Sequence, residues 1–323
     1  MKIDALSELM PTDGRFPRPD WQSIEQALDD VADDAVHEAW CEVGRVWLRQ
    51  VAQACGPDYS VFETENFLIL NCLDDRPSAS IGAFMERSRA GVLSMLDGIG
   101  LDGGAGKNVV LLFGNDELYY DYIAYFYSEG EHPMSSGVFI SHYYSHMAIP
   151  HFDMYETEAT FAHEFTHRCL SHLPIPLWLN EGLAVTLEDE LCGSRPIRMD
   201  SKQLERHKQF WDAQTIQEFW NGLSFGRIDE GNELSYELAR FCIKALAQDA
   251  HRFTGFANNS TYEDGGEAAA FAFFEGSLGG LPYQFFGDGD WSPKPDEWSS
   301  AEAESDQSVH RSGSTGRDAR DDG

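Results

Sequence analysis

Near the start of the chain, apolar residues recur at intervals of three and four positions, which is the spacing of an amphipathic helix. The series runs from Trp21 to Val51, and most of the aspartates between its members fall on the opposite face. Gly56 follows the series directly before a proline, and this pair stops helices. The pattern therefore predicts one long helix over residues 20–54, preceded by a loop over residues 11–19.

From residue 59 onward, short apolar runs alternate with helical patterns, as in a sheet covered by helices. The runs predict a strand or hairpin, a helix, a buried strand, a tyrosine-rich helix and two paired short strands, at residues 61–73, 78–96, 108–113, 116–127, and 137–141 with 146–149. A helix over residues 156–173 follows, and Pro174 and Pro176 end it. Later amphipathic helical segments lie at residues 201–220, 233–249 and 266–278.

These patterns divide the chain into four segments and predict an α+β fold. An N-terminal helical segment spans residues 1–57, an α+β half spans residues 58–190, and a mostly helical C-terminal half spans residues 191–298. Residues 299–323 contain no aromatic and almost no aliphatic side chain, which predicts a disordered acidic tail.

The chain of 323 residues carries 55 acidic and 23 basic side chains, a net charge of −32. Such a surface repels nucleic acids and anionic membranes, so we expect neither as a partner. No apolar run is long enough for a transmembrane helix, and the N-terminus lacks the pattern of a secretory signal. The six cysteines show no Cys-x-x-Cys spacing, which is typical of reduced thiols. We therefore expect a cytoplasmic protein, whose oligomeric state stays open.

The segment His163-Glu164-Phe165-Thr166-His167 carries the most specific chemistry of the chain. Helix positions four apart are separated by only about 40°, so both imidazoles project from one face. Two histidine nitrogens at this spacing can bind one Zn²⁺ at about 2.0–2.1 Å. Glu164 lies beside that face, within reach of a water on the metal rather than of the metal itself. The segment therefore predicts a catalytic zinc site.

A second motif, Trp178-x-x-Glu181-Gly182-x-Ala184, follows on the next predicted helix. A catalytic zinc needs three protein ligands and one open position, and two histidines with a glutamate are a common set. With these two motifs the chain resembles the gluzincin zinc metallopeptidases, and most closely their short-spaced, peptidase-MA-like members.

The resemblance implies a zinc peptidase acting on a peptide or protein, with His163, His167 and Glu181 as zinc ligands and Glu164 as the general base. It implies a zincin-like fold, in which the mixed sheet lies against the HExxH helix. It also implies an oxyanion-stabilising tyrosine from the C-terminal helical half. Tyr236, at the start of a Tyr-Glu-Leu-Ala helix, matches that position; the alternative is a tyrosine that only anchors its helix.

In this family, the strand before the metal helix pairs with the substrate backbone, by β-augmentation of an open sheet edge. The runs at residues 137–141 and 146–149 are both candidates for this edge, and packing of the core is the alternative for both. The chain lacks the Gly-x-Met-Glu-Asn motif of the aminopeptidases, which favours endopeptidase action or a specialised substrate.

Other residues near the motifs have less specific patterns. His172 lies five residues past His167, about 140° round the helix, so we expect it to point away from the metal. Glu188 is either a hydrogen-bond partner of a ligand or a solvated helix residue. We expect Trp178 to pack the ligand helix against the metal helix. Three histidines that precede the metal helix either shape the substrate side or are solvated: His142, His146 and His151.

Three functions remain: a zinc peptidase, a zinc hydrolase of a non-peptide substrate, and a catalytically silent interaction protein. The presence of Glu164 and Tyr236 argues against the third, because a structural zinc site needs neither residue and closes its fourth position with another side chain.

Overall fold

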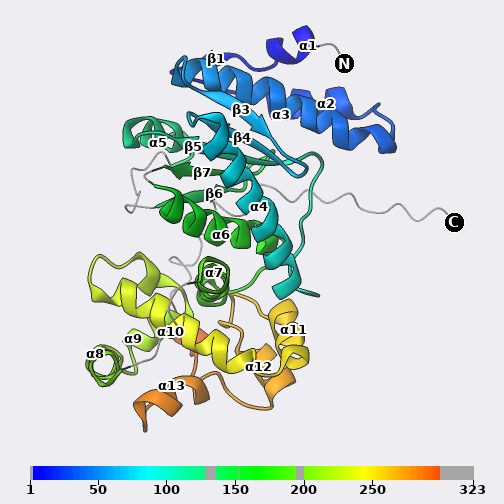
Figure 1. Cartoon of the computed structure of the whole chain (residues 1–323). Helices are drawn as coiled ribbons and strands as arrows, with labels where there is room; N and C mark the ends of the chain where they lie inside the picture. Colours follow the sequence, from blue (N-terminus) through cyan, green and yellow to red (C-terminus); the bar gives the residue numbers. More distant parts are fainter. Residues whose placement is uncertain (1–2, 128–135, 152, 194–199, 299–323) are drawn as a thin grey trace, which may run out of the picture.

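A five-stranded mixed sheet forms the middle layer of the N-terminal half (Figure 1). The structure, a computed structural model, describes residues 3–127, 136–151, 153–193 and 200–298. In spatial order the strands are β3 (Ser60–Glu63), β4 (Phe67–Asn71), β5 (Asn108–Phe113), β7 (His146–Pro150) and β6 (Val138–Ile140). The central β4, β5 and β7 are parallel, and the outer β3 and β6 are antiparallel to their neighbours. The predicted hairpin, buried strand and paired short strands are confirmed.

Helices cover both faces of the sheet, which explains why its parallel strands are buried throughout and mostly apolar. One face carries α1 (Ile3–Glu8), α2 (Trp21–Leu28), α3 (Asp33–Cys55) and α5 (Asp116–Ile123), and the other carries α4 (Asp75–Met95) and α6 (Met154–Leu170) (Figure 1). Alternate residues of β4 point to opposite faces. Phe67 and Ile69 therefore pack with α4 and α6, whereas Leu68 and Leu70 pack with α3.

The single helix predicted over residues 20–54 is wrong, because two helices occupy this stretch. α2 ends at Leu28, and α3 begins at Asp33. Asp33 and Asp34 stand in the first turn of α3, where the positive end of the helix dipole favours carboxylates. The loop predicted over residues 11–19 also contains a short antiparallel pair, formed by β1 (Thr12–Asp13) and β2 (Phe16–Pro17).

Helix α7 (Leu177–Cys192) connects the sheet half to a group of C-terminal helices. These are α8 (Ser201–Phe210), α9 (Thr215–Trp220), α10 (Glu230–Leu246), α11 (Ala250–Asn259), α12 (Glu267–Phe274) and α13 (Gly280–Phe286), with 3₁₀ turns at Leu223–Gly226 and Pro295–Glu297. The segment predicted as one helix over residues 201–220 is divided. Asp212 divides it by accepting hydrogen bonds from the amides of Gln214 and Thr215, at the start of α9. The described chain is α+β and mostly helical, as predicted.

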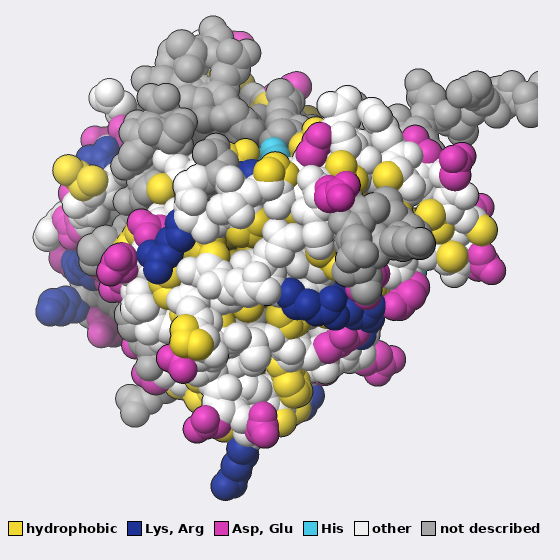
Figure 2. Space-filling view, turned by 90° about the horizontal axis from the view of Figure 1, so that it is seen from above, with side chains coloured by type: hydrophobic (Ala, Val, Ile, Leu, Met, Phe, Trp, Pro, Cys, Tyr) yellow, Lys and Arg dark blue, Asp and Glu magenta, His cyan; other side chains and the backbone are white. Residues whose placement is uncertain are grey.

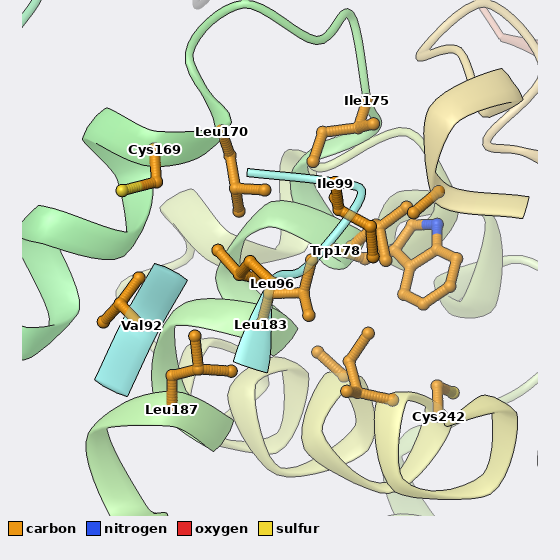
Figure 3. Packing of buried hydrophobic residues seen from close by; sticks show 14 of the residues in the cluster. Val92, Leu96, Ile99, Cys169, Leu170, Ile175, Trp178, Leu183, Leu187 and Cys242 are labelled. Atoms are coloured by element: carbon orange, nitrogen blue, oxygen red, sulfur yellow. The ribbon is translucent and has the colours of Figure 1, made fainter. Parts of the chain in front are cut away.

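One buried apolar cluster extends from the sheet to the C-terminal helices. Side chains from α4, α6, α7 and α10 meet in it, among them Val92, Leu170, Leu183 and Cys242 (Figure 3). The α+β half and the helical half therefore share a core.

Trp178 anchors α7 to the C-terminal helices. Its indole N–H donates a hydrogen bond of 2.9 Å to the Gly265 carbonyl, and its ring stands edge-on to Trp220 with centroids 5.4 Å apart. Further ring contacts are with Phe219 and Phe256. The sequence predicted packing of Trp178 between α7 and the metal helix; its side chain shares a buried cluster with Leu170 of α6, and the sequence did not indicate its ring contacts with the C-terminal helices.

Acidic side chains are scattered over the face shown in Figure 2, with single Lys and Arg side chains between them. No helix in the described part of the chain combines the length and the apolar character needed to cross a membrane. All six cysteines are free, and Cys41, Cys169 and Cys242 are buried. The tail predicted at residues 299–323 lies outside the described residues.

His146 belongs to the core on the α3 side of the sheet, and not to a substrate surface. Its Nδ1–H donates to the Tyr144 carbonyl at 2.9 Å, and its Nε2 accepts from the Tyr122 hydroxyl at 2.7 Å. The ring also stands edge-on to Trp47, with centroids 5.0 Å apart. Burial lowers the pKa of the His146 imidazole to about 4, so the folded protein holds it neutral.

We expect His146 to make the fold sensitive to acid. The unfolded chain protonates this imidazole near pH 6.5 and the folded chain only near pH 4, so stability falls as the pH falls between these values. The shift corresponds to about 3 kcal/mol. Urea unfolding at a series of pH values should show this loss in the wild type and a smaller one in His146→Asn. His251→Asn, on an exposed residue of α11, controls for removing a histidine.

Candidate metal centre

Helix α6 presents His163 and His167 on one face. Asp153 begins the helix by accepting a hydrogen bond from the amide of Glu156. From Phe161 to the helix end, every residue except His163 is buried. The two imidazole rings stand edge to face with centroids 4.7 Å apart, so the HExxH segment lies on a helix, as predicted.

Glu181 of α7 lies against both imidazoles. Its Oε2 is 3.3 Å from Nε2 of His163 and 3.6 Å from Nε2 of His167. One possible ligand atom from each of the three residues lies within 4.8 Å of the other two, and no other group of His, Cys, Asp or Glu in the described residues is so arranged. The structure thus brings together the three residues that the sequence predicted as ligands.

Gly182 sets how closely α7 approaches α10. A Cβ atom at this position would lie 2.8 Å from Cγ1 of Ile243 and 3.0 Å from the carbonyl oxygen of Ala239. Larger side chains would push the helices apart, because packed cores do not absorb such overlaps without strain. The glycine of the Glu-Gly motif therefore helps to set the depth of Glu181 beside the two histidines.

Both histidines are oriented through their second ring nitrogen. Nδ1 of His167 lies 2.9 Å from Oδ1 of Asn180, and Nδ1 of His163 lies 3.2 Å from Oε2 of Glu188. An oxygen at this distance accepts a hydrogen bond from Nδ1, so Nε2 is the nitrogen that faces the centre of the site. Of the two roles open for Glu188, the structure favours that of ligand partner. The sequence reasoning missed Asn180, although it lies inside the second motif.

The buried carboxylate of Glu181 favours a cation in the site. Oε2 of Glu181 is buried and has no hydrogen-bond partner. Burial alone would raise the pKa of Glu181, but the imidazoles of His167 and His163 outweigh it and hold the pKa far below its usual range. Burial alone would lower the pKa of His163, but Glu181 and Glu188 raise it well above its usual range. An orphaned carboxylate oxygen beside two oriented imidazoles fits a metal ion with two nitrogen ligands and one oxygen ligand.

Glu164 belongs to α6, and its side chain reaches strand β6. Burial raises the pKa of its carboxyl group, whereas the two ligand histidines and the backbone N–H of Phe139, which donates to it, lower it. A Cβ atom on Gly137 would lie 2.4 Å from Thr160 and 3.4 Å from Cγ of Glu164. The glycine thus lets the β6 segment pass close to Glu164. β7 pairs with strands on both sides, so only the β6 candidate offers an open edge in the described sheet.

Tyr236 enters the same region from α10. Burial is the main cause that raises the pKa of its phenol, and the charges of Glu181 and Glu164 raise it further. Its ring stands edge-on to Phe225 with centroids 5.1 Å apart. The phenol therefore stays protonated at neutral pH. The carboxylates of Glu181 and Glu164 are close enough to influence its pKa.

The remaining histidines named from the sequence lie outside this group. His151 is 2.6 Å from the hydroxyl of Thr157, and His142 packs edge-on against Phe126. His172 is exposed just past the end of α6. No family model, curated protein or solved structure matches this chain.

We expect purified protein to bind about one zinc ion per chain, and His167→Ala to lose it, because two ligands cannot hold the metal against a chelator. Asn180→Ala should keep the site but weaken zinc affinity about 10- to 100-fold, since the imidazole of His167 loses its orientation. Elemental analysis after dialysis measures the content, and competition with a chromophoric chelator measures the affinity.

His172→Ala is the matched control, because it removes an exposed histidine just beyond the same helix. Its zinc content and affinity should equal those of the wild type. Equal zinc content in wild type and His167→Ala would show that the metal binds elsewhere.

Proposed function

We propose that this protein is a zinc-dependent peptidase with His163, His167 and Glu181 as its zinc ligands. The observation that carries the proposal is the convergence of both Nε2 atoms on a buried carboxylate oxygen that lacks a hydrogen-bond partner. A set of two imidazoles and one carboxylate leaves a tetrahedral ion one open position, which is the arrangement of catalytic rather than structural zinc. The resemblance of the two motifs to the gluzincins supports the same assignment.

A zinc ion held by this set supplies Lewis-acid chemistry, which lowers the pKa of water and polarises a carbonyl group. Glu164 accepts the proton of the attacking water and delivers it to the leaving amine. Tyr236 keeps its proton because burial raises the pKa of its phenol, and it donates a hydrogen bond to the developing oxyanion.

A peptide substrate is favoured by the position of β6. This strand is at the end of the described sheet, and the N–H of its central residue, Phe139, hydrogen-bonds Glu164. An extended chain that adds to such an edge lies beside the general base. A substrate without a peptide backbone gains nothing from this edge.

Glu164→Gln should abolish hydrolysis while zinc stays bound, because the amide cannot accept the water's proton and the ligands are untouched. We expect a rate loss of at least about 100-fold, measured on a pool of quenched fluorescent peptides of mixed sequence. Glu158→Gln makes the same change elsewhere on α6, outside the ligand group, and should cleave at the wild-type rate.

Near-wild-type turnover in Glu164→Gln would show that the mechanism is wrong. Two other results would favour the alternative functions. Wild-type protein that binds zinc but cleaves only esters or other non-peptide bonds is a hydrolase of another class, and zinc-loaded protein without any hydrolysis is an interaction protein.

Tyr236→Phe tests the oxyanion role. Phenylalanine preserves the ring contact with Phe225 and removes only the hydroxyl donor. We expect kcat to fall by about 100- to 1,000-fold, with KM and the melting temperature nearly unchanged. A tyrosine that merely anchors α10 gives the opposite pattern, a lower melting temperature with an unchanged kcat.

A further inference from the structure

A polar cavity lies beside α6, on a different side of the helix from the ligand group. It has a volume of about 190 Å³, and its charged lining residues are Arg89, Lys107 and Arg168 together with Glu65 and Asp102. Cations outnumber carboxylates in this lining, although the chain as a whole carries a net charge of −32. We refer to this cavity as the Arg168 pocket.

Arg168 is held in this pocket with unused hydrogen-bonding capacity. It follows the ligand His167 and is therefore turned by about 100° round the helix, onto a different face. Its side chain is 9 % exposed; Nη2 donates to the Gly103 carbonyl at 2.7 Å, and Nη1 is 3.5 Å from Asp102. Its Nε is buried and has no partner. A guanidinium group carries five N–H donors, so Arg168 keeps donors for a further acceptor.

Arg89 of α4 faces the same carboxylate. Its Nε donates to Oδ2 of Asp102 at 2.5 Å, and this is its one hydrogen bond within the described part of the chain. Asp102 therefore serves two guanidinium groups with a single negative charge. Nζ of Lys107 forms an ion pair with Oε1 of Glu63, which lies outside the pocket, at 2.7 Å.

The loop between Asp102 and Lys107 contains three glycines and passes close to Arg168. A Cβ atom on Gly104 would approach Nη2 of Arg168 to 3.7 Å, and one on Gly103 would meet no atom within 4 Å. Gly104 also has φ +117°, a conformation that side chains other than glycine rarely adopt. The loop is tied to the end of α6 by a hydrogen bond from the Leu101 amide to the Cys169 carbonyl.

We propose that the Arg168 pocket binds a phosphoryl dianion, either free phosphate or the phosphate of a small metabolite. Guanidinium groups bind phosphate oxygens through paired N–H donors. Asp102 faces both Arg89 and Arg168, which leaves one positive charge uncompensated, because Lys107 is paired with Glu63. Glu65, the other carboxylate of the lining, is exposed. Phosphate also offers more oxygen acceptors than a monocarboxylate for the N–H donors of the two guanidinium groups. The bound group bridges α4, α6 and the loop before β5.

Isothermal titration of the full-length protein with inorganic phosphate tests the proposal, with acetate as the monovalent comparison. We expect phosphate to bind with a Kd of about 1 mM or tighter, and acetate to show no saturable binding. Arg89→Gln should weaken phosphate binding at least tenfold, and Asp102→Asn should strengthen it several-fold, because the carboxylate competes for the same donors. Arg227→Gln is the matched control, since that arginine is similarly exposed and paired but lies elsewhere.

Phosphate also binds zinc, so the titration is repeated with Glu181→Gln, which alters a ligand on α7 and leaves the Arg168 pocket intact. Unchanged phosphate affinity in that variant separates the pocket from the metal centre. Absence of saturable phosphate binding overturns the proposal, as does equal binding by acetate or an unchanged Kd in Arg89→Gln. A glycerol phosphate titration then distinguishes the sources: tighter binding than phosphate indicates a metabolite, and weaker binding indicates the free ion.

Discussion

The ionised carboxylate of Glu181 is the constraint around which the centre of the molecule is arranged. Its Oε2 is buried without a hydrogen-bond partner, and a buried carboxylate is strongly destabilising unless positive charge lies beside it. The surrounding structure meets that need in several ways. Two imidazoles converge on it, Asn180 and Glu188 orient them, and Gly182 allows α7 to lie close to α10. Together these contacts hold the carboxylate of Glu181 beside the two imidazoles, where a cation can bind.

The ligand set was predictable because it depends on local geometry. His163 and His167 share a face in any helix, and Glu181 belongs to a recognisable motif on the next one. The roles of Asn180 and Glu188 were not predictable to the same degree. Both depend on how α7 crosses α6, which is a tertiary relation that spacing within one helix does not contain. The Arg168 pocket was missed for the same reason, since its cations come from separate elements.

The secondary structure was likewise predictable where apolar periodicity alone decides it. The strands and most helices match the apolar periodicity. The break between Leu28 and Asp33 does not show in that periodicity; its signal is the pair of carboxylates in the first turn of α3. Strand order also escaped prediction. Periodicity marks β6 and β7 as strands, yet only the pairing places β7 inside the sheet and β6 at its edge.

Helix α7 carries Glu181 toward the imidazoles and Trp178 toward the C-terminal helices, so one rigid element connects the two regions. The aromatic shell around that indole, formed by Phe219, Trp220 and Phe256, lies outside the ligand group and yet determines where the carboxylate stands. A substitution that displaces the indole of Trp178 therefore also disturbs the position of Glu181, so the helical half constrains the candidate site without contributing a residue to the ligand group.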